Sequence, residues 1–303
     1  MPSTREYPPA PRDDIVEILH GVPVADPYRY LEDPDADRTV AFVDAQNALS
    51  APYLAALPGR DAVHRLTSAL LTAARRGAPW ERGGRYFLIA NPGELDQDLL
   101  VTAESLAELF DSPTLLVDPN TLSTDGTVAM TAATVSPDGE YLAYALAEAG
   151  SDWRTIRVRR VATGADLPDE LRWTKWIDPT WLPDASGFLY WSYPEPAGGR
   201  FTSALGAGEL VLHRLGDQPT ADELIWARPD AHEWMAEPWV AADGSWLVLT
   251  TSPGTDSRST ISARRLPRDA GGRYHVDGAT VTVVDELADA HRVVAADGDT
   301  LYL

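Results

Sequence analysis

A short turn followed by an apolar strand recurs five times along this chain, and this repeat restricts the possible folds more than any other feature. The clearest copy is the turn at residues 136–139 (SPDG), where proline presets the second turn position and glycine relieves strain at the last. It leads into residues 141–146, a nearly continuous apolar run typical of a strand buried on both faces. The alternating segment 153–161 then predicts a second strand that returns antiparallel.

The other copies follow the same order of turn and strand. Their turns are residues 83–85, 184–187, 243–244 and 297–298, and their strands are residues 86–90, 188–193, 246–250 and 301–303. The spacing between turns is roughly 45 to 60 residues, which is typical of propeller blades. The sequence therefore predicts a mainly β fold, an incomplete β-propeller of about five blades, each with four antiparallel strands.

A different pattern precedes the repeat. Residues 1–35 contain seven prolines and predict an extended arm. Residues 35–50 read as an amphipathic helix, and residues 51–76 as one or two more helices, broken near 57–59 and ending at 75–77. We expect two domains: an N-terminal arm and helical segment over 1–77, and a partial propeller over 78–303.

Charge and composition exclude several classes of partner. The net charge is −21 and Lys175 is the only lysine, so the surface should repel nucleic acid and anionic membranes. The chain has no cysteine, which excludes disulfides, a thiol nucleophile and thiolate metal sites. Its N-terminus lacks an apolar signal region, and no run of 18 apolar residues occurs. We expect a cytoplasmic protein without nucleic-acid or membrane partners.

Two N-terminal motifs resemble a known family. Residues 20–33 (HGVPVADPYRYLED) and 45–47 (AQN) resemble the N-terminal signature of the prolyl oligopeptidase family of serine peptidases. Residues 136–153, 190–193 and 213–216 are similar to later segments of that family, so the resemblance covers the whole chain.

The resemblance implies a helical N-terminal segment, a seven-bladed propeller and a C-terminal α/β-hydrolase domain. In that arrangement the helical segment packs on the hydrolase domain, and the propeller restricts access to short peptides. This sequence departs from the pattern because it stops at Leu303, after about five blades.

The sequence contains no recognisable catalytic or metal-binding motif. The family cleaves peptides with a Ser-His-Asp triad whose serine lies in a G-x-S-x-G turn, and no such turn occurs here. His232-Glu233 lacks the second histidine of a zinc motif, the aspartate-rich turns lack the ligand pattern of a calcium loop, and no phosphate-binding loop is present. We expect no catalytic residue, metal or cofactor in this chain, and no activity when it is alone.

Two tryptophans are candidate substrate contacts. The resemblance implies that Trp176 lines an outer substrate subsite and that Trp226 contributes nearby, where an apolar wall would suit a residue upstream of the proline. The alternative is that both side chains pack between blades, as propeller tryptophans commonly do.

Three functions remain open from the sequence. The first is the N-terminal region of a prolyl oligopeptidase-like serine endopeptidase that acts on short proline-containing peptides through a hydrolase domain outside this chain. The second is a free-standing propeller that serves as a binding module, and the third is a five-bladed glycosidase with paired carboxylates. The motif at residues 20–33 favours the first, because neither alternative requires it.

Overall fold

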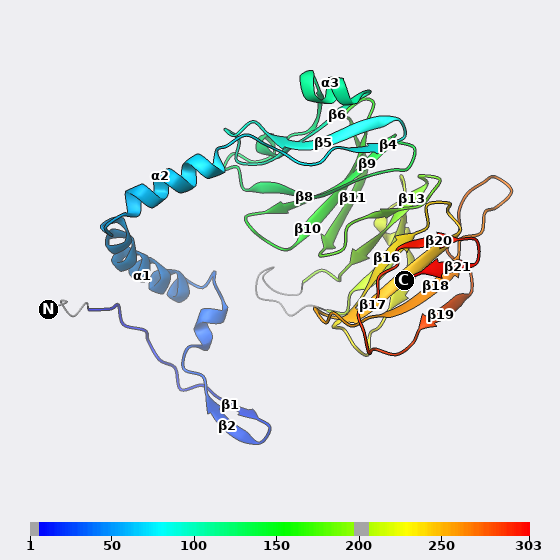
Figure 1. The fold of residues 1–303 in the computed structure, drawn as a ribbon. Coiled ribbons are helices and arrows are strands. Elements are labelled where there is room, and N and C mark those ends of the chain that lie inside the picture. Colours follow the sequence, from blue (N-terminus) through cyan, green and yellow to red (C-terminus); the bar gives the residue numbers. More distant parts are fainter. Residues whose placement is uncertain (1–5, 197–205) are drawn as a thin grey trace. The chain divides into compact units, whose positions relative to one another are not determined.

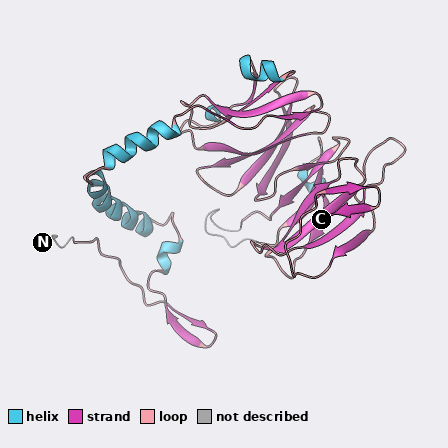
Figure 2. Cartoon of the chain, viewed as in Figure 1, coloured by secondary structure: helices cyan, strands magenta, loops and turns pink. Residues whose placement is uncertain are grey.

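The computed structural model describes residues 6–196 and 206–303, and the chain divides into two compact units. The first ends at Ala73 and the second begins at Ala74. Figure 2 shows that helices dominate the first unit and strands the second.

The N-terminal unit buries very little of its own surface. Its elements are β1 (Val16–Leu19), β2 (Val22–Ala25), the 3-10 helix η1 (Arg29–Glu32), α1 (Asp37–Ala55) and α2 (Arg60–Leu71). Among the described residues of this unit, Thr39 alone is buried, and its hydroxyl donates to the carbonyl of Tyr30 at 2.8 Å. Apolar side chains of α2 such as Leu66 and Leu70 are more than 60% exposed.

Helices are present in the predicted region, but two predicted boundaries are wrong. The helix expected to end at residue 50 continues to Ala55. The break near residues 57–59 separates α1 from α2, with Gly59 at a φ of 83° before α2. The helix expected to end at 75–77 ends at Leu71 instead, and Arg75–Arg76 form strand β3. This difference arises because Arg75 and Arg76 pair with the strand at residues 85–91, a long-range contact that local sequence does not display.

The second unit consists of successive antiparallel sheets (Figure 1). The first has β3 (Arg75–Arg76), β4 (Trp80–Arg82), β5 (Arg85–Asn91), β6 (Leu99–Ala103) and β7 (Thr114–Val117), with α3 (Leu106–Asp111) before β7 and η2 (Pro119–Thr121) after it. The second has β8 (Val128–Val135), β9 (Tyr141–Glu148), β10 (Arg154–Arg160) and β11 (Asp166–Thr174). The third has β12 (Thr180–Trp181), β13 (Gly187–Ser192), β14 (Glu209–Arg214) and β15 (Glu223–Ala227), with η3 (Pro219–Ala221) before β15. The fourth has β16 (Trp234–Val240), β17 (Trp246–Pro253), β18 (Thr260–Arg265) and β19 (Thr280–Val284), and the hairpin β20 (Ala295–Asp297) and β21 (Thr300–Tyr302) follows.

This order confirms the predicted mainly β fold of about five blades, the fifth represented by its hairpin. The second and third sheets meet edge to edge through one pair, Thr174 with Ser192. In the second to fifth blades each predicted turn lies between the first and second strands, and in the first sheet it lies between β4 and β5. The strands predicted directly after the turns are therefore β5, β9, β13, β17 and β21.

Alternate residues of β9 enter two different hydrophobic clusters. Leu142 and Tyr144 pack with Phe87 of the first sheet, whereas Ala143 packs with Phe188 of the third. Because successive side chains of a strand point to opposite faces, a strand covered on both faces must be apolar at every position. This packing accounts for the continuous apolar run in the sequence, and each such large side chain stabilises the fold by about 1.5–3 kcal/mol.

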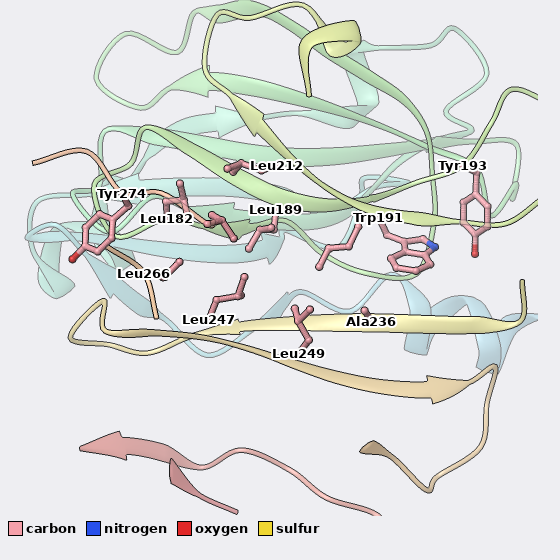
Figure 3. Close-up of a cluster of buried hydrophobic side chains, with 12 residues drawn as sticks. Leu182, Leu189, Trp191, Tyr193, Leu212, Ala236, Leu247, Leu249, Leu266 and Tyr274 are labelled. Carbon is pink, nitrogen blue, oxygen red and sulfur yellow. The ribbon is translucent and has the colours of Figure 1, made fainter. Parts of the chain in front are cut away.

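A further cluster joins the third and fourth sheets (Figure 3). It includes Leu189 and Trp191 of β13, and Leu247 and Leu249 of β17. The other face of β17 directs Val248 into a separate cluster with Ile261 of β18. The same two-faced packing is therefore repeated from sheet to sheet.

The turns of neighbouring blades also touch each other. Gly83 has a φ of 57° and Gly139 a φ of 76°, a region that favours glycine. A Cβ atom on Gly83 would collide with the backbone carbonyl of Asp138, and one on Gly139 would lie 2.7 Å from the carbonyl oxygen of Arg82. Both glycines are thus required by backbone conformation and by close approach between blades.

Candidate functional site

A cavity of about 520 Å³ lies where the first strands of three successive blades meet. Thr134 of β8, Thr180 of β12 and Glu237 of β16 all line it. Two hydrogen bonds connect these strands beside the cavity: Trp181 Nε1 donates to the Thr134 carbonyl at 2.9 Å, and Thr180 Oγ1 donates to the Pro238 carbonyl at 3.4 Å. The volume is within the range of sites for small organic groups.

Residues 176–179, the connection between the second and third sheets, form one wall of the cavity. Trp176 is 47% exposed and has a φ of 62°, and Trp173 has a φ of 59°. A left-handed conformation costs a residue other than glycine about 1–2 kcal/mol, so the surrounding packing must hold this connection in place.

An aromatic cluster provides that packing. The Trp153 ring makes edge contacts with Trp173 at 5.5 Å and with Tyr193 at 5.7 Å between centroids. The Lys175 ammonium lies 4.0 Å from the centre of the Trp153 ring and 5.6 Å from that of Trp176. Burial lowers the pKa of Lys175, with the charge of Asp152 acting in the opposite direction. The cation therefore lies against the ring faces and helps to fix the backbone that carries Trp176.

The charges that line the cavity are acidic. Asp178 is paired with Arg154, whose Nη1 is 2.9 Å from Asp178 Oδ1. Glu237 is exposed and makes no ion pair with any described residue. No lysine, arginine or histidine is found among the described lining residues. Glu237 therefore contributes the uncompensated charge of the cavity.

One lining hydroxyl is also without a partner. Thr134 Oγ1 is buried and has no hydrogen-bond partner among the described residues. Thr250 and Ser252 of β17 also line the cavity, and they pair across the sheet with Glu237 and Met235 of β16. Since directly paired residues of an antiparallel sheet project to one face, Glu237 has hydroxyl groups beside it.

The two predicted substrate contacts occupy different environments. Trp176 lines the cavity, whereas Trp226 of β15 is half-buried and is absent from the described lining. The Trp226 ring packs on Trp191, with 5.9 Å between centroids, at the edge of the cluster between the third and fourth sheets. Sequence reasoning missed Glu237 and Thr134, because neither belongs to a motif and only the pairing of distant strands brings them together.

The histidines form no nucleophilic site in the part of the chain that the structure describes. His213 is fully buried between two carboxylates, and His275 approaches Asp269 at 3.2 Å on the surface. Nδ1 of His291 donates to the backbone carbonyl of Ser259 at 3.2 Å. No histidine ring among residues 6–196 and 206–303 bonds to a serine hydroxyl, and no group of three or more metal-ligating side chains occurs there.

Membrane insertion by a helix finds no support in these residues: no described helix is long and apolar enough to span a bilayer.

Comparison with known proteins agrees with the fold. Residues 8–303 match the family model described as the N-terminal β-propeller domain of prolyl oligopeptidase. A prolyl endopeptidase of Elizabethkingia meningoseptica is 26% identical over 299 residues, which cover 98% of this chain and 40% of that protein. Prolyl oligopeptidase ophP of Omphalotus olearius is 31% identical over 279 residues, covering 83% of this chain and 37% of that protein.

The solved structures give a similar result. Prolyl oligopeptidase B from Galerina marginata, bound to a 35mer hydrolysis and macrocyclization substrate, matches with a TM-score of 0.83 and 26% identity. That alignment covers 98% of this chain and 44% of the Galerina protein. The chain thus spans less than half the length of the relatives that it matches.

Proposed function

The chain belongs to the prolyl oligopeptidase family as its N-terminal β-propeller region, and from this membership we propose that it is part of a serine endopeptidase that cleaves short proline-containing peptides. The match over residues 8–303 is the observation that carries the proposal. In this proposal, the chemical step belongs to an α/β-hydrolase domain outside residues 1–303, since these residues contain no G-x-S-x-G turn. The propeller limits access to short peptides and contributes walls to the substrate site.

We assign separate roles to the two proposed domains. Residues 1–77 supply a packing surface for the hydrolase domain, which accounts for the exposed apolar side chains of α2, including Val63 and Leu66. Residues 78–303 supply the substrate-facing surface. A cytoplasmic location is part of the proposal, because a chain without cysteine has no need of an oxidising compartment.

Within the propeller, Trp176 is the proposed aromatic wall for the peptide. Its half-exposed ring borders the cavity, and the aromatic cluster around Trp153 helps to fix the backbone that carries it. Trp226 is proposed as an outer contact through the part of its side chain that Trp191 leaves uncovered. A free-standing binding module is the alternative function, and the same cavity would then be its ligand site.

The test is to express the complete open reading frame that contains these residues and to assay a blocked Gly-Pro peptide with a fluorescent leaving group. The expected result is cleavage after proline, with little cleavage of the matched Gly-Ala peptide. A control uses a proline-containing protein of about 100 residues, which should resist cleavage. Absence of cleavage, or equal cleavage after proline and alanine, would leave the binding module as the better function.

A further inference from the structure

The cavity lining has the chemistry of a site for an organic cation. It combines one uncompensated carboxylate, Glu237, with the exposed ring of Trp176 and with hydroxyl groups that include the unpartnered Thr134 Oγ1. A carboxylate and an aromatic face are the two groups that proteins use to hold ammonium and guanidinium ions.

A metal ion fits this lining less well. Such an ion needs several ligating side chains together, and the described residues contain no group of three or more. The volume of about 520 Å³ is also far larger than a dehydrated ion, and lies in the range of pockets that hold small organic ligands.

The neighbouring cations do not occupy the site. Arg154 is held by Asp178, with 2.9 Å between their charged atoms. Lys175 lies nearest to the ring of Trp153 and is not part of the lining. Glu237 therefore keeps its charge available on the cavity side, in a chain whose net charge of −21 adds long-range attraction for cations.

We propose that this cavity binds a positively charged group of the peptide, an arginine or lysine side chain or the N-terminal ammonium, between the Glu237 carboxylate and the Trp176 ring. This inference rests on the proposed function, because it names the class of peptide that the propeller would favour. It adds a charge preference to the apolar wall provided by Trp176.

The test compares matched peptides by calorimetry on residues 1–303. The first pair consists of two pentapeptides that are blocked at both ends. One carries arginine before an Ala-Pro dipeptide, and the other carries uncharged citrulline at the same position. We expect the arginine peptide to bind roughly 5- to 30-fold more tightly, and the preference to shrink when salt is raised from 50 to 500 mM. A second pair, with alanine in place of arginine and either a free or an acetylated N-terminus, shows whether the N-terminal ammonium is the preferred cation.

Variants then assign the preference to the cavity. Glu237→Gln should bring the arginine-to-citrulline ratio close to 1 and leave the citrulline affinity unchanged, whereas Glu237→Asp should retain part of the preference. Glu209→Gln on β14 removes the same charge from an exposed position outside the cavity and should leave the ratio unchanged. Equal binding of all four peptides, no binding up to millimolar concentration, or a ratio that survives Glu237→Gln would overturn the proposal.

The complete protein separates this inference from the function on which it rests. Cleavage after proline with equal kcat/KM for the arginine and citrulline peptides would refute the charge preference and leave the peptidase function intact. A retained arginine preference in binding, without any proline-dependent cleavage, would refute the peptidase function and keep the cation site.

Discussion

Nε2 of His213 lies 2.9 Å from Oδ1 of Asp169, and this fully buried contact joins β14 to β11 across 44 residues of sequence. The other ring nitrogen, Nδ1, lies 2.8 Å from Oδ1 of Asp222. Ionised carboxylates only accept hydrogen bonds, so a ring placed between two of them donates from both nitrogens and is an imidazolium. The contact is therefore an internal ion pair between the second and third sheets.

The stability of the propeller should fall at alkaline pH because of this histidine. Burial opposes the charged ring, but the hydrogen bonds to Asp169 and Asp222 prevail and raise the pKa of His213 to about 9. A raised native pKa gives stability that is complete below the unfolded value of about 6.5 and is lost as the pH rises through about 9, roughly 3 kcal/mol in all. Urea unfolding of wild type and His213→Gln between pH 6 and 10 checks this, and an equal pH slope for the two proteins would contradict it.

Gly83→Ala should destabilise the propeller by about 2–4 kcal/mol. Alanine at this position must adopt the positive φ of the native backbone, which costs about 1–3 kcal/mol. Its Cβ would also collide with the Asp138 carbonyl of the next blade. Gly84→Ala is the matched control: its φ is 79°, but a Cβ there meets no atom within 4 Å. The melting temperature should be highest for wild type, lower for Gly84→Ala and lowest for Gly83→Ala. Equal decreases in melting temperature for the two variants would show that the contact between blades does not contribute.

Trp226→Ala and Trp176→Ala should differ in stability. Trp226 belongs to the edge of the cluster between the third and fourth sheets and packs on Trp191, so its loss should cost about 2–4 kcal/mol. Trp176 is 47% exposed, so its loss should cost less than about 1 kcal/mol. Denaturant midpoints of the two variants measure the difference. A larger loss of stability for Trp176→Ala than for Trp226→Ala would contradict the burial assigned to the two side chains.

Trp176→Ala should weaken peptide binding by the complete protein without slowing the chemical step. A wall remote from the scissile bond interacts equally with the ground state and the transition state, so KM should rise about 5- to 150-fold while kcat changes little. Steady-state kinetics with peptides that carry a residue upstream of the proline provide the measurement. An unchanged KM for these peptides would assign Trp176 to structure alone.

Residues 1–303 alone should hydrolyse no peptide. Acyl transfer needs an activated serine and donors directed at the oxyanion, and no histidine ring in the described residues bonds to a serine hydroxyl. A fluorophosphonate probe should therefore leave the mass of the purified chain unchanged. Stoichiometric labelling of one serine, abolished by changing one histidine, would reveal a nucleophilic site.

Local sequence predicted the strand that follows each turn because its signals are strong: a turn with glycine and then a dense apolar run. The first strands are harder to recognise: β12 is two residues long, Thr180–Trp181, and its partner in β13 determines its conformation. The sequence pattern places β3 in a helix for the same reason. The pairing partners of β3 are Asn91 and Ala90, which local sequence does not indicate. Strand pairing over long separations decides such segments, and single-residue propensities do not record it.

The candidate site was predicted in part. Trp176 stands out in the sequence because four tryptophans lie between residues 173 and 191, and the structure places it in the cavity lining. Its role as a substrate contact, implied by the family resemblance, stays a prediction. Glu237 and Thr134 give no comparable signal, because a glutamate and a threonine in strands usually face solvent. They become candidate site residues only because β8, β12 and β16 come together in the fold and form the cavity.

The solitary lysine offers a practical consequence. Lys175 is the only lysine among these 303 residues, and burial against the Trp153 ring shields its ammonium group. When residues 1–303 are prepared as a separate chain, amine-reactive dyes should therefore react almost entirely at the α-amino group of that chain. Growth of the same chain on lysine labelled only at the ε-methylene group would give a single labelled side-chain NMR signal, shifted upfield by the indole ring current. A change in the position of this signal would report ligand binding in the adjoining cavity.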